Sequence, residues 1–131
     1  MTRMIMGLCV GALAFLGTDL NAHHSMAEYT TTERVTIQGE VVAFEFRNPH
    51  SFIHLVVTEA DGSRIRYAVE WGGSSQLASL GITATTLRPG DVVIVSGFPA
   101  QNAADRRIRL LGLERPSDGF VFAHRSGQVL G

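Results

Sequence analysis

Histidine gives this 131-residue chain its clearest capacity for metal chemistry. His23 and His24 lie side by side near the N-terminus, His50 closes an Asn-Pro-His segment, and His54 follows four residues later. Imidazole and amine nitrogens suit Cu(II), Ni(II) and Zn(II). A chain that begins at His23 presents its α-amine, its imidazole and the next amide together. These residues predict a copper or zinc site in which His24 or His50 supplies a second imidazole.

Glu70 is the carboxylate that we assign to the predicted metal site. Side chains alternate along a strand, so His50 and His54 share one face of a predicted strand. Glu70 belongs to the next predicted strand, from which it either ligates the metal or orients a ligating imidazole by accepting its second N–H. The alternative interpretation is that the His-His pair is a solvated tail and that His50 only hydrogen-bonds its own turn.

An apolar segment ahead of the histidines predicts export. Arg3 provides a positive charge, and the run from Ile5 to Leu16 is too short to span a bilayer, which takes about 20 apolar residues. Such a run is typical of a secretory signal peptide. Cleavage after Ala22 makes His23 the first mature residue, whereas cleavage after Ala27 removes both histidines, and an uncleaved anchor is the third possibility. We predict a signal peptide at 1–22 and a periplasmic or secreted protein.

The predicted mature chain, 23–131, has the size of one domain. The signal's charges, Arg3 and Asp19, cancel, so the mature chain keeps the formal charge of −1. Nucleic-acid binding usually requires a basic surface. We therefore expect a metal ion or small ligand as partner, no nucleic acid, and no membrane association after signal cleavage. Cys9 is the only cysteine and lies in the predicted signal, which excludes disulfides from the mature protein.

The elements that would position these residues are mainly strands. Alternating apolar and polar residues predict strands at 35–46, 52–58, 65–71, 92–96 and 107–113, a short last strand at 120–123, and one helix at 75–80. Three strands, a helix and two strands is the order of the small five-stranded Greek-key barrel of the OB-fold type. Another antiparallel barrel or sandwich is the alternative. Residues expected in the core are Val35, Ile37, Ile53, Leu55, Tyr67, Val69, Val93, Val95 and Leu110.

The motifs together resemble a family of small exported bacterial proteins classed as a domain of unknown function. The matching segments are His23-His24-Ser25-Met26, Gly39, Asn48-Pro49-His50, Asp61-Gly62, Glu70, Gly72-Gly73, Leu87–Val92 and Gly97-Phe98-Pro99. The resemblance implies export and one compact β domain, and it carries no established activity. This chain departs from it at Ala103-Ala104, where a polar, glycine-containing loop is usual.

Three functions follow from these patterns. The first is a periplasmic binding module for copper or a similar metal, with His23, His24 and His50 as ligands and Glu70 nearby. The second is a module that binds a small organic ligand or a protein on the barrel face without metal. An enzyme is the third, and we expect none, because no acid/base pair or nucleophile constellation is visible. The group of Arg106, Arg107 and Arg109 could bind an anion, but we interpret the alternating arginines at 107 and 109 as the exposed face of their strand.

Overall fold

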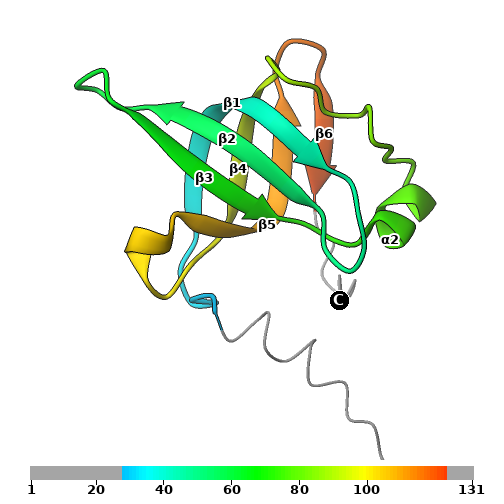
Figure 1. The fold of residues 1–131 in the computed structure, drawn as a ribbon, viewed down its shortest axis with the longest axis horizontal. Helices are drawn as coiled ribbons and strands as arrows, with labels where there is room; N and C mark the ends of the chain where they lie inside the picture. The colour runs from blue at the N-terminus through cyan, green and yellow to red at the C-terminus, as the bar shows by residue number, and fades with distance from the viewer. Residues whose placement is uncertain (1–27, 124–131) are drawn as a thin grey trace, which may run out of the picture.

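The chain folds into a small closed barrel, seen in a computed structural model that describes residues 28–123 (Figure 1). The elements are β1 (Val35–Glu45), β2 (Phe52–Thr58), β3 (Arg64–Glu70), α2 (Ser74–Ser79), β4 (Val92–Pro99), the 3-10 turn η1 (Ala103–Asp105), β5 (Arg107–Arg115) and β6 (Phe120–Ala123). The prediction of an all-β, OB-fold-like, five-stranded barrel with one short helix between strands three and four is confirmed. The predicted signal peptide lies outside the described residues.

Barrel closure depends on one parallel strand pair. The sheet order is β3-β2-β1-β4-β5-β6, with an additional pairing between β3 and β5. That pairing is parallel and places Glu70 opposite Arg109, whereas the other strand pairs are antiparallel. β1 pairs with β4 through its first half and with β2 through its second half. A register shift between Val41 and Ala43 bends β1.

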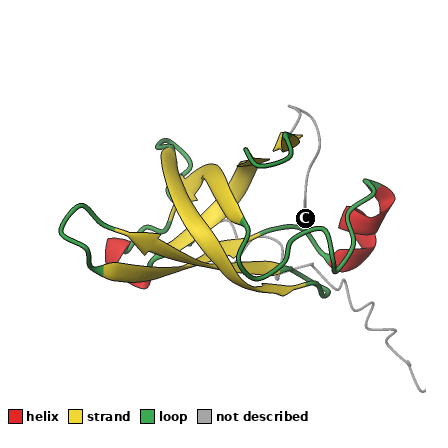
Figure 2. Ribbon diagram, turned by 90° about the horizontal axis from the view of Figure 1, so that it is seen from above, coloured by secondary structure: helices red, strands yellow, loops and turns green. Residues whose placement is uncertain are grey.

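The core fills most of the barrel but not all of it. Six of the predicted core residues are buried: Ile53, Leu55, Val69, Val93, Val95 and Leu110. Val35, Ile37 and Tyr67 are only half-buried, contrary to our expectation, because they lie near one end of the barrel that α2 does not cover. The helix and the loop after it are at the opposite end, where Leu77 and Leu87 are buried (Figure 2). No helix among residues 28–123 is long and apolar enough to cross a membrane.

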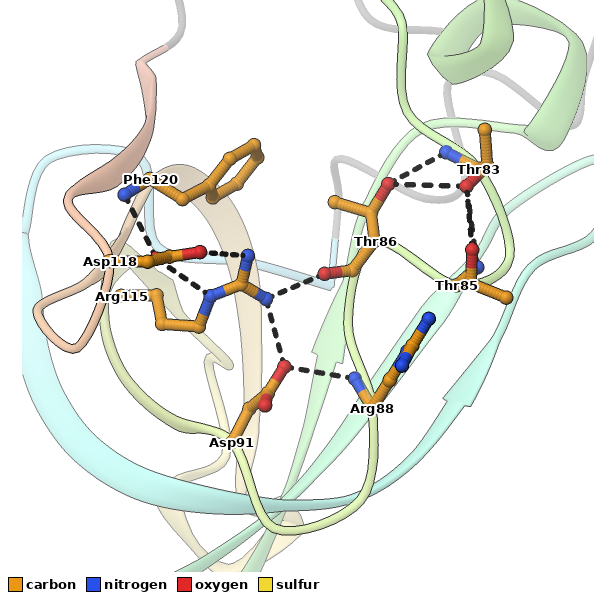
Figure 3. Close-up of polar contacts among 8 residues, drawn as sticks. All are labelled: Thr83, Thr85, Thr86, Arg88, Asp91, Arg115, Asp118 and Phe120. Carbon is orange, nitrogen blue, oxygen red and sulfur yellow. Dashed lines mark hydrogen bonds and ion pairs between the residues drawn. The ribbon is translucent and has the colours of Figure 1, made fainter.

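Arg115, the last residue of β5, joins the loop before β4 to the turn between β5 and β6. Its Nη1 donates to the Thr86 carbonyl at 2.6 Å and to Asp91 Oδ2 at 2.8 Å, while Nε and Nη2 donate to the carboxylate of Asp118 (Figure 3). Asp91 also accepts the backbone N–H of Arg88 at 3.0 Å, which closes the turn before β4. The last strands are therefore held to the loop that enters β4.

Candidate functional site

Glu70 is a buried carboxylate on the outer face of the barrel. Its neighbours Val69 and Trp71 belong to the core, so strand alternation directs Glu70 outward. Its accessible surface is nevertheless only 2% of the maximum. A carboxylate that loses its water needs charged or hydrogen-bonding partners to offset the cost of desolvation. The side chains around Glu70 supply them.

Three side chains from distant parts of the chain donate to Glu70. The hydroxyl of Tyr29 donates to Oε2, Nη2 of Arg107 lies 3.3 Å from Oε2, and Nη1 of Arg109 lies 3.2 Å from Oε1. Burial and the hydrogen bond to Glu70 raise the pKa of Tyr29 far above its usual range, so Tyr29 is a neutral donor. Arg107 also pairs with Glu28 at 3.0 Å.

His50 faces the same carboxylate. Its Nδ1 lies 3.5 Å from Glu70 Oε1 and 3.4 Å from Arg109 Nη1. The imidazole is mostly buried, with 18% of its side-chain surface exposed. Its other nitrogen, Nε2, has no hydrogen-bond partner among residues 28–123. Two of the predicted site residues, His50 and Glu70, are thus brought together by the fold.

The position of His50 is fixed by contacts between the Asn-Pro-His turn and the start of α2. Asn48 accepts the backbone N–H of Ser75 at 3.2 Å and donates to its hydroxyl at 2.9 Å. Gly73 passes so close that a Cβ there would lie 2.6 Å from the carbonyl oxygen of Pro49. The Asn-Pro-His and Gly-Gly motifs therefore pack against each other, and this contact positions His50 beside the end of β3.

The N-terminal segment reaches the site as a short strap, residues 28–30. Tyr29 forms an isolated β-bridge with Ala100. Thr30 N–H donates to the Pro99 carbonyl at 2.8 Å, and Gln101 N–H donates to the carbonyl of Glu28 at 2.9 Å. The strap thereby carries the Tyr29 hydroxyl onto Glu70 and covers that carboxylate. His23 and His24 lie outside the described residues, a few positions before the strap.

The other described histidine belongs to a separate contact. His54 Nε2 lies 3.4 Å from Glu45 Oε1, and its ring stacks on Phe52 with centroids 6.5 Å apart. Within residues 28–123 no three His, Cys, Asp or Glu side chains are grouped closely enough to hold a metal ion. His50 and Glu70 therefore need a donor from elsewhere to complete a metal site.

Sequence reasoning missed Tyr29 and the burial of Arg109. Arg109 is 5% exposed, so our interpretation of residues 107 and 109 as an exposed strand face is wrong for Arg109. The reason is the parallel β3–β5 pairing, which sets Arg109 against Glu70 under the strap. Alternation along the fifth strand correctly put Arg107 and Arg109 on the outer face. It could not predict that β3 lies beside that strand.

The chain belongs to a family of unknown function, DUF6152, whose model matches residues 12–108. No curated protein matches the chain. Among solved structures, it is similar to a chain of the Stn1-Ten1 complex of S. pombe, with 20% identity and a TM-score of 0.43 over 65% of this chain and 61% of that one. It is also similar to Rim1, a mitochondrial single-stranded DNA-binding protein of S. cerevisiae, with 14% identity and a TM-score of 0.42 over 71% and 97%. The match spans less than two thirds of the Stn1-Ten1 chain.

These neighbours correct one expectation. We excluded a nucleic-acid partner because the chain is near neutral, yet Rim1 is a single-stranded DNA-binding protein. At these levels of identity the similarity concerns the fold alone, and it assigns no ligand to this chain.

Proposed function

We propose that the protein is an exported metal-binding module that takes copper or zinc. His50 and the N-terminal histidines, His23 and His24, are the ligands, and Glu70 orients His50. One observation carries the proposal: Tyr29, five residues after His24, is bound to the same carboxylate that His50 faces. Five residues of extended chain span at most about 18 Å. This reach supports the proposal, because it allows the N-terminal histidines to approach His50.

Glu70 suits the role of an orienting group better than that of a ligand. Both of its oxygens already accept hydrogen bonds, from Tyr29 and Arg107 at Oε2 and from Arg109 at Oε1. Metal-bound histidines commonly donate their second N–H to such a carboxylate. We therefore keep Glu70 in the site as the partner of the His50 ring and assign metal coordination to nitrogens.

The ring proton of His50 decides whether it binds metal. If Nδ1 accepts from Arg109, the proton of the neutral ring is on Nε2, and Nε2 has no lone pair to donate. If Nδ1–H faces Glu70, the lone pair of Nε2 is available. Metal binding selects the second arrangement, and the carboxylate beside Nδ1 stabilises it.

Calorimetric titration of the exported protein with Cu(II) and Zn(II) tests this proposal. Replacing His50 with alanine should weaken binding at least about 100-fold, since a ligand contributes more than an orienting group, whose loss costs 10–100-fold. His54→Ala is the matched control, because His54 contacts Glu45 instead of Glu70, and its affinity should equal that of the wild type. Equal affinity for the wild type and His50→Ala would refute the metal site.

A further inference from the structure

The end of the barrel away from α2 contains a pocket that the proposed metal site does not use. The pocket has a volume of about 330 Å³ and opens between the start of β1, the middle of β3 and the segment that carries η1. Figures 1 and 2 both show η1 and α2 at opposite ends of the molecule. Ligand pockets commonly measure about 300–1,000 Å³, so this one has room for a small molecule only.

The floor of the pocket is apolar. Val35 and Ile37 of β1 and Ile108 of β5 line it, with Ala103 of η1 at the side. Ile108 is fully buried, whereas Val35 and Ile37 are the half-buried residues that leave the core incomplete at this end. An apolar ligand group seated here would cover the surface of Val35 and Ile37 that now faces solvent, which is favourable in proportion to the area removed from water.

Arg106 brings a positive charge to the rim of this pocket. Its Nη1 donates to the hydroxyl of Tyr67 at 3.2 Å, and its guanidinium lies 5.8 Å from the centroid of that ring. Within residues 28–123 it forms no ion pair with a carboxylate, in contrast to Arg107, which pairs with both Glu28 and Glu70. The charge of Arg106 is therefore not neutralised by a described carboxylate.

The backbone of Arg106 is strained. Its φ is 50°, and it is the only residue other than glycine with positive φ in the described part of the chain. This conformation costs an ordinary side chain energy, and glycine or asparagine adopts it more easily. An arginine placed there keeps its guanidinium above Tyr67 at the mouth of the pocket. Strain of this kind is often found where a side chain is held for ligand binding.

We propose that this end of the barrel binds a small carboxylate with an apolar tail. The tail lies against Val35, Ile37 and Ile108, and the carboxylate meets the Arg106 guanidinium and the Tyr67 hydroxyl. A guanidinium recognises a planar carboxylate through parallel N–H donors, which favours an anion of this shape. The site is separate from the proposed metal ligands and goes beyond the proposed function.

Titration of the full exported protein with octanoate, octanol and octylamine in metal-free buffer tests the ligand class. The three probes share a chain length and differ in charge. Octanoate should bind at least about tenfold more tightly than octanol, which corresponds to one charge-assisted hydrogen bond, and octylamine should bind most weakly. Equal affinity for octanoate and octanol, or no binding of octanoate, would overturn the proposal.

Two variants locate the site. Arg106→Gln should weaken octanoate binding about tenfold or more, while Arg64→Gln, an exposed arginine at the start of β3, should leave it unchanged. Ala103→Trp fills the pocket from an exposed position outside the core, so the barrel should fold, as circular dichroism would verify, and octanoate binding should be lost. Unchanged octanoate affinity in either Arg106→Gln or folded Ala103→Trp would contradict the proposed site.

Discussion

Glu70 is nearly inaccessible to water although it projects from the face of β3 opposite the core. The sequence identified it as a site residue because of its type and its expected neighbour, His50. The reasons for its burial come from three other segments: the strap with Tyr29, and the two arginines of β5. A carboxylate in this position is an electrostatic counterpart for the arginines and lies 3.5 Å from Nδ1 of His50.

Replacing Glu70 with glutamine should therefore destabilise the fold, because the nearby Arg109 would keep its charge with its carboxylate partner removed. Breaking one side of a buried ion pair typically costs about 3–5 kcal/mol. Urea unfolding followed by tryptophan fluorescence measures the loss. Glu45→Gln, at an exposed carboxylate of β1, is the control and should change the unfolding free energy by less than about 1 kcal/mol. A Glu70→Gln protein as stable as the wild type would contradict this account of Glu70.

At the scale of the elements, the backbones of β4 and β5 lie very close together at Gly97. A Cβ at this position would lie 2.0 Å from the carbonyl oxygen of Arg109, and the register of the two strands shifts between Ser96 and Gly97. Only a residue without a side chain fits such a backbone contact. Gly97 thus allows β4 to pair closely with β5, the strand that carries Arg107 and Arg109. These two arginines, Tyr29 and Glu70 form the Glu70 cluster.

Gly97→Ala should lower the unfolding free energy by about 3 kcal/mol, since the added methyl group meets rigid backbone. Gly112→Ala is a matched control on the neighbouring strand, because its Cβ would meet the movable Ser96 hydroxyl at 2.9 Å and cost less. Chemical denaturation of both variants provides the comparison. A smaller loss in Gly97→Ala than in Gly112→Ala would show that the strand contact relaxes easily.

The β5–β6 turn should respond to acid through Asp118. Hydrogen bonds from Arg115 lower the pKa of Asp118 below its ordinary value of 3.8. A carboxyl whose pKa is depressed by folding stabilises the native state above its unfolded pKa, and this contribution is lost as the pH falls through the folded pKa. The stability difference between the wild type and Asp118→Asn should therefore be largest near neutral pH and disappear below pH 3.8.

Thermal unfolding of both proteins across this pH range measures the effect. Asp105→Asn, on the exposed η1 turn, serves as a control for the loss of one negative charge. A difference between the wild type and Asp118→Asn that grows on acidification would have the wrong sign for the Arg115 interaction.

Strand positions were largely predictable from the sequence, but the contacts between elements were not. Alternation located five strands to within a few residues, because each strand must bury one face. Alternation did not indicate what holds the start of the helix, where Asn48 accepts the backbone N–H of Ser75 from 27 positions earlier. Residue types indicated His50 and Glu70 in the candidate site. Tyr29 became relevant only once the structure showed the strap paired with the end of β4.

At the scale of the whole molecule, the order of the chain connects the proposed processing to the proposed metal site. Residues 28–30 lie on the outside of the barrel and end beside the Glu70 cluster. Whatever precedes residue 28 therefore joins the chain at Glu28, which pairs with Arg107 beside Glu70. The first mature residue decides which donor groups are present there.

We expect the exported protein to begin at His23, because Ala22 is the nearest small residue after the apolar run. Intact-mass spectrometry of protein recovered from the periplasm measures the mature N-terminus. A mature protein that begins at Glu28 would lack both N-terminal histidines and end the metal proposal. It would leave the pocket beside Arg106 unaffected.

Closure of the barrel through β3 and β5 has a kinetic consequence. The contacts that seal Glu70 join residues 39 and 41 positions apart in the chain. A long loop must lose its conformational freedom before such contacts form, and proteins dominated by distant pairings fold in about milliseconds to seconds, more slowly than helical bundles. Glu70 therefore loses its hydration shell only once both the β3–β5 pair and the strap are in place.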